Sequence, residues 1–417
     1  MDINTELSMG RFEKVLNNLK ERRERVLNGL YNCVPFPFPR FRRWVPGVEQ
    51  GKYIVVTANQ KVGKSKFCDY LFIYEPLFFA LEHPELRLKV LYFTLEMSPD
   101  EKYNEFLCHL LFRLDGLQIS PTDLKSTEKE NPISEDILKL LETDRYQRYI
   151  KAFEKMVTYI DDIRNPTGIN KCCRDYALSH GHLNYTKVMT KDSVTGDVVE
   201  MRVVDVDNPY TADDPEEHRI VIIDNASNLT NEKEMKKMET IDRMSKYGIQ
   251  LRNQLKYIFV LIQHQAQAQE GIENQKLNRL KPSSDGLADC KTTTRDANMV
   301  IGLYSPFKYG IKEYEGYDIT RFRNHIRFME VIEDRDYSAS GQICPLFFDG
   351  AVSTFNELPL PTDTRGIEQV YSYLDARNKK PNKAFLSIGI SKTDKRLHKW
   401  NMFSKFATLL RNIKSES

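Results

Sequence analysis

The feature that most constrains the fold is the segment Ala58-Asn-Gln-Lys-Val-Gly-Lys-Ser65, which lies between an apolar run and a helix-compatible stretch. The apolar run is Tyr53-Ile-Val-Val-Thr57, and the stretch that follows begins Lys66-Phe-Cys-Asp-Tyr. A strand, a loop ending in Gly-Lys-Ser and a helix are the context of a phosphate-binding loop. The backbone N–H groups of such a loop and the N-terminus of its helix bind the phosphates. The segment therefore predicts binding of a nucleoside triphosphate.

Each position of this loop, and the residue after it, is assigned to nucleotide binding. These positions are Ala58, Asn59, Gln60, Lys61, Val62, Gly63, Lys64, Ser65 and Lys66. Gly63 lets the backbone approach a phosphate closely, Lys64 can reach the β- and γ-phosphate oxygens, and the Ser65 hydroxyl can ligate Mg²⁺. The strict motif begins with Gly, whereas this chain has Ala58.

The composition indicates a folded protein without a strong electrostatic bias. Of the 417 residues, 41% are hydrophobic, which is enough to bury a sizeable core. The formal net charge of +2 argues against a disordered chain or one that coats polyanions. The seven cysteines include no Cys-x-x-Cys pair, the start lacks a signal peptide, and no apolar run approaches a membrane span. We therefore expect a soluble, cytoplasmic protein without a membrane partner.

Strand-like and helix-like patterns alternate from residue 52 to residue 355. Strand-like apolar runs are found at 53–57, 89–95, 158–160, 219–223, 257–262, 299–303, 327–332 and 343–348. Helical patterns are found at 65–82, 99–114, 135–156 and 232–255. This alternation predicts an α/β fold with a doubly wound, mainly parallel sheet, helices on both faces, and ligands at the carboxyl ends of the strands. The last runs, with a turn at Asp349-Gly350, predict an antiparallel C-terminal hairpin at the edge.

Three segments lie outside this pattern. Residues 9–31 have apolar side chains at helical spacing and precede the proline-rich segment 35–39, which predicts a tethered amphipathic helix. This helix can pack on its own domain or on a neighbouring subunit. Residues 183–217 predict an inserted β-hairpin arm. The tail from residue 376 onward has eleven basic and two acidic residues, a net charge of +9.

Two carboxylates are predicted at strand ends. Asp224 ends the run Arg219-Ile-Val-Ile-Ile-Asp224, where the acid of a phosphate-loop ATPase holds Mg²⁺. Glu96 follows another such run, and Ser98-Pro-Asp-Glu101 directly after it is typical of a helix start. A carboxylate at this crossing can orient and deprotonate the water that attacks the γ-phosphate. We therefore predict Ser65 and Asp224 as metal ligands and Glu96 as the catalytic base.

A third apolar strand ends in the polar string Gln263-His-Gln-Ala-Gln267. A polar side chain at this position can contact the γ-phosphate and report its loss to the loop that follows. The residue in contact depends on the strand register, so Gln263, His264 and Gln265 remain open as candidates.

These motifs, in this order, resemble the RecA-like ATPase domain of DnaB-family replicative DNA helicases, including phage-encoded ones. The family's phosphate loop commonly begins with Ala, as at Ala58. The other matching segments are Thr94-Leu-Glu-Met97, Tyr159-Ile-Asp-Asp162, Asp224, Asp296-Ala-Asn-Met-Val-Ile301, Ile332-Glu-Asp-Arg-Asp336 and Phe347-Phe-Asp-Gly350. The resemblance covers roughly residues 35–357.

The resemblance implies an ATPase that uses ATP and Mg²⁺ and works as a homo-oligomer, expected to be a hexameric ring in the family's manner. We therefore predict Lys64, Glu96, Arg335 and His264 as the catalytic residues. In the family, an Arg at the position of Arg335 enters the nucleotide site of the neighbouring subunit. The family's nearby Lys corresponds to Glu333, so an anion replaces one of two interface cations here.

The resemblance also implies contacts with single-stranded DNA in loops that line a central channel. These loops correspond to the residues after Asp224 and to the stretch between His264 and Asp296. The candidate nucleic-acid residues are Lys281, Lys291 and Arg295. The segment Leu287-Ala-Asp-Cys-Lys291 replaces the family's Leu-Arg-Glu-Ser-Gly. A few cations on such loops suit binding to the DNA backbone without sequence readout.

The predicted domain organisation has three parts. Residues 1–34 form a linker helix, residues 35–357 form the RecA-like ATPase domain with its arm, and residues 358–417 form a basic C-terminal extension. The family's globular N-terminal domain is expected to be missing, and the linker helix packs on the adjacent subunit in the family. A primase or a loader is a possible partner, and a phage-encoded protein would lie in the host cytoplasm.

Three functions are compatible with these residues. The first is a helicase motor in DNA replication that translocates on single-stranded DNA and hydrolyses ATP at subunit interfaces. The second is a RecA-like filament or recombination mediator that uses ATP as an assembly switch. The third is a degenerate ATPase with a structural role, against which the intact Lys64, Ser65, Glu96 and Asp224 argue.

Overall fold

The computed structural model describes residues 10–191, 196–277 and 279–378. The basic tail beyond residue 378 and residues 192–195 of the predicted arm lie outside these described residues. Within the described ranges, no helix has the length and apolar character that a membrane crossing requires.

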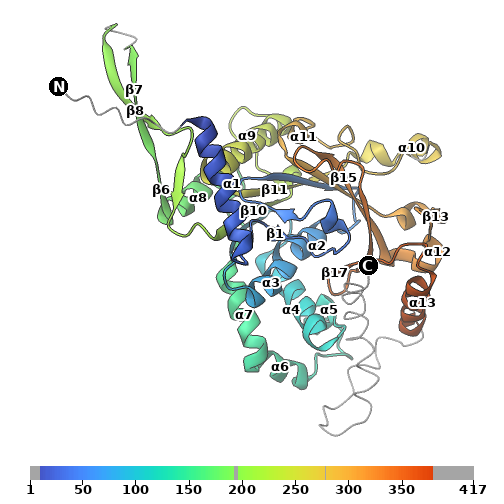
Figure 1. Ribbon diagram of the computed structural model, residues 1–417. Helices are drawn as coiled ribbons and strands as arrows, with labels where there is room; N and C mark the ends of the chain where they lie inside the picture. The colour runs from blue at the N-terminus through green and yellow to red at the C-terminus, as the bar shows by residue number, and fades with distance from the viewer. Residues whose placement is uncertain (1–9, 192–195, 278, 379–417) are drawn as a thin grey trace.

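A nine-stranded sheet forms the centre of the protein (Figure 1). Its strand order is β17-β16-β15-β12-β3-β11-β10-β4-β5. The strands from β12 to β5 pair in parallel, whereas β15, β16 and β17 form an antiparallel edge. The bounds are β3 (Tyr53–Ala58), β4 (Arg87–Thr94), β5 (Val157–Ile160), β10 (Glu217–Asp224), β11 (Ile258–His264), β12 (Met299–Tyr304), β15 (Ile326–Asp334), β16 (Ile343–Asp349) and β17 (Thr354–Glu357). The predicted strands, the mainly parallel sheet and the C-terminal hairpin are confirmed.

Helices cover both faces of this sheet. Side chains of β3 alternate between the two faces, so that Ile54 and Val56 lie in one apolar cluster and Tyr53 and Val55 lie in the other. The first face is covered by α2 (Lys64–Asp69), α3 (Glu75–Glu82), α4 (Pro99–Asp115) and α7 (Asp144–Met156). The second face is covered by α8 (Pro166–Ser179) and α9 (Lys237–Leu255). The doubly wound α/β architecture is therefore confirmed.

The helices depart from the predicted bounds in three places. The helix after the phosphate loop runs through residues 64–82, but a π-helical turn, Tyr70–Tyr74, separates α2 from α3. The predicted helix over 135–156 is split into α6 (Glu135–Glu142) and α7, because Thr143 between them has an extended backbone with ψ of 149°. The helix predicted from 232 begins at Lys237, because Glu234 has a left-handed backbone with φ of 64° and Lys236 is extended with ψ of 163°.

The antiparallel edge is packed against α12 (Ile319–Phe322) and α13 (Thr364–Asn378). Val370, Tyr371 and Leu374 of α13 are buried in one cluster with Phe322 and Phe347. Part of the segment predicted as a C-terminal extension therefore contributes to the packed core.

An arm projects from the body at the upper left of Figure 1. It consists of the antiparallel strands β7 (Tyr185–Lys191) and β8 (Val198–Val204), which stand on the pair β6 (Gly181–Leu183) and β9 (Tyr210–Ala212). An antiparallel hairpin therefore lies within residues 183–217.

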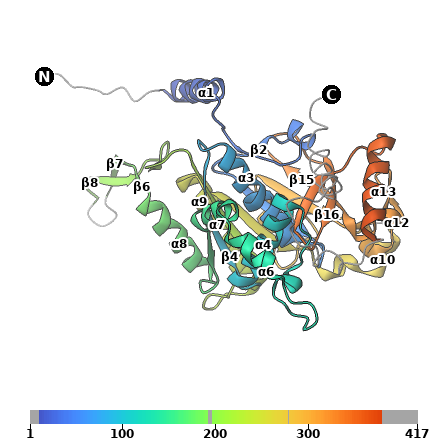
Figure 2. The same ribbon diagram turned by 90° about the horizontal axis from the view of Figure 1, so that it is seen from below.

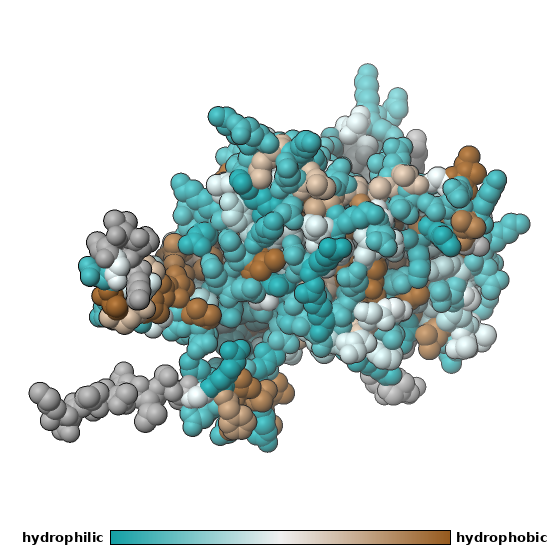
Figure 3. Space-filling view, turned by 90° about the horizontal axis from the view of Figure 1, so that it is seen from above, coloured by the Kyte–Doolittle hydropathy of each residue, from teal (hydrophilic) through white to brown (hydrophobic). Residues whose placement is uncertain are grey.

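Helix α1 (Arg11–Leu27) stands off from the body, as Figure 2 shows, and none of its side chains is buried. Its apolar side chains Phe12, Val15, Leu19 and Val26 are exposed. Figure 3 shows apolar surface on helix α1 and on the arm, and further apolar patches on the body. The ion pairs that hold α1 are Lys14–Asp207 at 2.7 Å, Arg22–Glu49 at 2.9 Å, and Arg25–Glu216. The helix thus contacts its own chain through charged side chains. Its exposed apolar side chains, here called the apolar stripe, are not covered by its own chain.

Candidate active site

Strand register brings the predicted site residues to one edge of the sheet. Ala58 at the end of β3 is level with His264 at the end of β11, and Asp224 at the end of β10 is level with Thr94 at the end of β4. Glu96 follows Thr94 by two positions. Because these strands are parallel, their carboxyl ends share the edge at which ligands bind in such sheets.

The loop between β3 and α2 has the shape that a phosphate requires. Gly63 has a φ of 102°, which favours glycine, and a Cβ added there would lie 3.3 Å from the ring of Phe348. Lys64 is 6% exposed, and burial lowers the pKa of its ammonium to about 8, although Asp224 and Glu96 act in the opposite direction. A phosphate anion beside this ammonium would favour its charged form. The residues present therefore fit the phosphates of a nucleotide.

Side chains from distant parts of the chain hold this loop in place. Arg327 donates from Nε to the carbonyl of Val62 at 2.8 Å, and Lys308 donates to the carbonyl of Gln60 at 2.9 Å. Arg327 is 2% exposed, and burial lowers the pKa of its guanidinium to about 9. Sequence reasoning missed Arg327, since it belongs to no motif and acts on the loop only through the folded structure.

Ser65 and Asp224, the two predicted metal ligands, are in direct contact. The Ser65 hydroxyl donates to Oδ1 of Asp224 at 3.0 Å, and the Tyr92 hydroxyl donates to Oδ2 at 2.7 Å. Because Oδ2 is occupied, Oδ1 is directed toward Ser65 and the phosphate loop. Hydroxyl and carboxylate oxygens are ligands of the kind that Mg²⁺ takes, so this pair fits Mg²⁺ bound with a nucleotide.

A buried lysine that sequence reasoning missed supports this acid. Lys102 of α4 is 0% exposed, and its ammonium lies 2.8 Å from Oδ2 of Asp69 and 3.4 Å from Oδ2 of Asp224. Burial alone would lower the pKa of Lys102, but the nearby acidic groups, led by Asp69 and Asp224, more than offset burial and raise it. The cation therefore balances two buried acids beside the proposed metal site.

Replacing Lys102 with methionine is expected to lower the free energy of unfolding by about 3–5 kcal/mol, because removing one partner leaves a buried charge uncompensated. The double variant Lys102→Met/Asp69→Asn, which also removes one of the acids, should recover part of this loss. Urea denaturation of the wild type and both variants measures the effect. A single variant as stable as the wild type would contradict the buried-charge account.

Asn225 connects Glu96 with His264. Its Nδ2 atom donates to Oε2 of Glu96 at 2.6 Å and lies 3.1 Å from Nε2 of His264. Burial and the nearby Lys64 lower the pKa of His264 to about 4, so its ring is neutral near pH 7. An amide nitrogen is only a donor, so Nε2 accepts and Nδ1 carries the proton. Among the described residues, the buried Nδ1 atom has no hydrogen-bond partner.

The two glutamines beside His264 are engaged elsewhere. Gln263 is buried and donates to the carbonyls of Ala288 and Cys290, both at 2.6 Å. Gln265 is also buried and donates to the Thr57 hydroxyl at 3.0 Å. Of the three open candidates, His264 is the one whose side chain lies beside Asn225 and Glu96.

Arg335 lies at the other end of the parallel strands, where β3 and β12 begin. Its backbone N–H donates to the carbonyl of Asn298 at 3.0 Å, and the preceding Asp334 pairs with Met299 at the start of β12. Met299 is level with Ile54 near the start of β3. β3 has 6 residues, so at about 3.3 Å per residue the two edges are roughly 17 Å apart. The exposed Arg335 therefore cannot reach the phosphate loop of its own chain.

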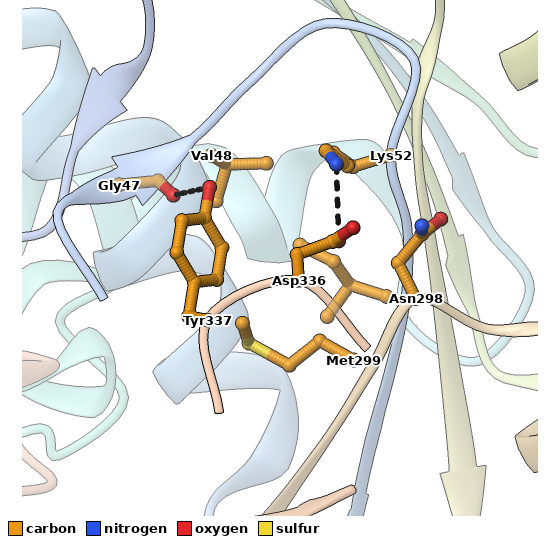
Figure 4. Close-up of a pocket in the computed structure, with 8 residues that line it drawn as sticks. Gly47, Val48, Lys52, Asn298, Met299, Asp336 and Tyr337 are labelled. Atoms are coloured by element: carbon orange, nitrogen blue, oxygen red, sulfur yellow. Dashed lines mark hydrogen bonds and ion pairs between the residues drawn. The ribbon is translucent and has the colours of Figure 1, made fainter. Parts of the chain in front are cut away.

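Residues that line a small pocket hold the turn that carries Arg335 (Figure 4). The ammonium of Lys52 lies 3.0 Å from the carboxylate of Asp336, and the Tyr337 hydroxyl donates to the carbonyl of Gly47 at 3.5 Å. These contacts fix the backbone next to Arg335 while its side chain remains exposed.

The candidate nucleic-acid residues lie on different elements. All three are exposed; Lys281 pairs with Glu330 of β15 at 3.0 Å, and Lys291 and Arg295 lie at the two ends of α11 (Thr292–Asp296). The carbonyl of Arg295 accepts from the Arg335 guanidinium. Glu333, at the family's Lys position, accepts from the Ser284 hydroxyl and is therefore already engaged within its own chain.

Comparison with solved structures identifies the fold. The chain is similar to a structure described as an ATPase domain, with a TM-score of 0.59 and 15% identity over 84% of this chain and all of that one. It is also similar to a DnaB-like replicative helicase described together with its interactions with primase, with a TM-score of 0.56 and 14% identity over 84% of this chain and 67% of that one. No protein-family model matches the sequence, and no curated protein matches it.

The central sheet and its helices have the RecA-like fold. Within that class, the chain has the fold of the ATPase domain of DnaB-like helicases.

Proposed function

We propose that this protein is an ATP-dependent DNA helicase motor that moves along single-stranded DNA and hydrolyses ATP between the subunits of a ring. The observation that carries the proposal is the position of Arg335, at the sheet edge opposite Lys64 and Ser65. A nucleotide site with its phosphate loop on one chain and its arginine on another requires head-to-tail contacts between copies, which generate rings or helical filaments.

The residues of one interface would divide the reaction as follows. Lys64 and the loop N–H groups bind the phosphates, and Ser65 and Asp224 would hold Mg²⁺, which would neutralise phosphate charge when bound. Glu96 orients the attacking water and takes its proton. His264 donates from Nδ1 to the γ-phosphate and loses this contact after hydrolysis. Arg335 of the neighbouring subunit stabilises the charge that develops on the transferred group.

Helix α1 supplies a second contact between subunits in this proposal. Its apolar stripe is exposed on its own chain, so it is available to an adjacent copy. Lys281, Lys291 and Arg295 would contact the phosphates of single-stranded DNA, and their contribution should weaken as salt rises. The second similar structure is described with primase, and a primase or a loader is the partner that we propose for this chain as well.

Unwinding of a forked DNA duplex tests the proposal. With ATP and Mg²⁺, the purified protein should separate the strands, single-stranded DNA should stimulate ATP hydrolysis, and Lys64→Ala should do neither. Electron microscopy with a non-hydrolysable ATP analogue and single-stranded DNA should show rings. Continuous coating of the DNA without strand separation would overturn the motor and favour a filament that uses ATP as an assembly switch.

A further inference from the structure

We propose that Asn225 is a positioning residue that restrains Glu96 until single-stranded DNA binds. The inference rests on the proposed function, in which Glu96 activates water and the loops after Asp224 and His264 contact DNA. It adds a regulatory connection between these loops and the carboxylate.

The contacts of Asn225 fix its orientation. Its side chain is 2% exposed, and its Oδ1 atom accepts the backbone N–H of Ser227 at 3.0 Å. This leaves Nδ2 to face Glu96 at 2.6 Å and His264 at 3.1 Å. Both ends of the amide are therefore engaged, and the Glu96 side chain is tied through one of its two carboxylate oxygens.

The same contacts connect Asn225 to the second loop. Ser227 lies in the short 3-10 helix Ala226–Asn228 after Asp224, and its hydroxyl donates to Oδ2 of Asp289 at 2.7 Å. Asp289 lies between Ala288 and Cys290, whose carbonyls are both held by Gln263 of β11. A continuous chain of hydrogen bonds thus runs from the loop after His264 through Ser227 and Asn225 to Glu96.

This arrangement can work as a two-state restraint. In the structure, Glu96 is exposed but tethered toward Asn225, which limits its movement toward a water at the γ-phosphate. DNA that binds the loops better when they have moved would shift the population toward that state. Movement of Asp289 would displace Ser227. The hydrogen bond from the Ser227 N–H to Asn225 would then be lost, and Asn225 would release Glu96.

Two substitutions should have opposite effects on this restraint: one should make it permanent and the other should remove it. Ser227→Ala removes only the hydroxyl and keeps the N–H that orients Asn225, so DNA can no longer release Glu96. It should keep the basal kcat and lose stimulation by single-stranded DNA, with the ratio of stimulated to basal kcat falling about tenfold or to one. Asn225→Ala removes the restraint itself. Its basal kcat should rise toward the stimulated wild-type value, its KM for ATP should stay unchanged, and DNA should add nothing further.

Steady-state ATP hydrolysis with and without an oligothymidine strand measures these ratios, and fluorescence anisotropy of the labelled strand verifies that each variant still binds DNA. Thr230→Ala is the matched control, because Thr230 is an exposed residue of the same loop and its hydrogen bond to the carbonyl of Arg164 comes from its backbone N–H, which the substitution keeps.

Normal stimulation of Ser227→Ala overturns the inference, and so does an Asn225→Ala variant that binds ATP but is inactive or is stimulated like the wild type. If Asn225→Ala does not fold, Ser227→Ala decides alone. A wild type without stimulation by DNA overturns the proposed function as well.

Discussion

Substituting Arg335 with alanine is expected to reduce ATP turnover by about 10³–10⁵, the range associated with an arginine supplied to a phosphoryl-transfer site from another chain. Binding of a fluorescent ATP analogue should be largely preserved, because Lys64 and the loop N–H groups hold the phosphates, whereas Arg335 stabilises charge that develops only in the transition state. Arg365→Ala is a suitable control, since it removes an equally exposed arginine from α13. An Arg335→Ala protein that hydrolyses ATP like the wild type would show that the assignment is wrong.

Mixing two inactive variants tests whether the arginine acts on a neighbouring subunit. Lys64→Ala removes the phosphate-loop lysine, and Arg335→Ala removes the arginine. In mixed oligomers, some interfaces combine the intact loop of one chain with the intact arginine of the other. Turnover should therefore recover in the mixture, to a fraction set by the mixing ratio. Absence of recovery in oligomers shown to contain both chains would contradict action between subunits.

Replacing Glu96 with glutamine should lower kcat by about 10²–10⁴, the usual contribution of a positioned general base. The amide is close in shape to the carboxylate and can still accept the hydrogen bond from Asn225, so ATP binding and thermal stability should be preserved. Single-turnover hydrolysis measures the chemical step directly. Asp100→Asn neutralises another exposed acid nearby, at the start of α4, and should have little effect. Equal losses in both variants would indicate a general electrostatic effect instead of base catalysis.

Much of the site could be predicted from sequence because its main residues belong to local patterns. Ser65 belongs to the phosphate-loop motif, and Asp224, Glu96 and His264 each follow an apolar strand of a parallel sheet. The carboxyl ends of such strands meet at one edge, so the pattern predicts their proximity without any long-range information. The arm and the C-terminal hairpin were predictable for a similar reason, since each consists of two β-prone runs close together in the chain.

The supporting residues could not be predicted, because their partners are distant in sequence. Lys102 acts on Asp69 across 33 positions, Asn225 on Glu96 across 129, and Arg327 on Val62 across 265. No periodicity or spacing encodes such contacts. The open choice among Gln263, His264 and Gln265 had the same cause, since it depended on hydrogen bonds to loops whose paths only the folded chain defines.

The uncovered stripe of α1 has a consequence for how the protein assembles. A helix of 17 residues with no buried side chain gains little from packing on its own chain, although most helical stability in proteins comes from packing of an apolar face. If neighbouring copies cover the stripe, ordering of this helix and association of subunits become one equilibrium. The helical content of the protein should then rise with its concentration, and far-ultraviolet circular dichroism over a dilution series would follow assembly through the folding of a single segment.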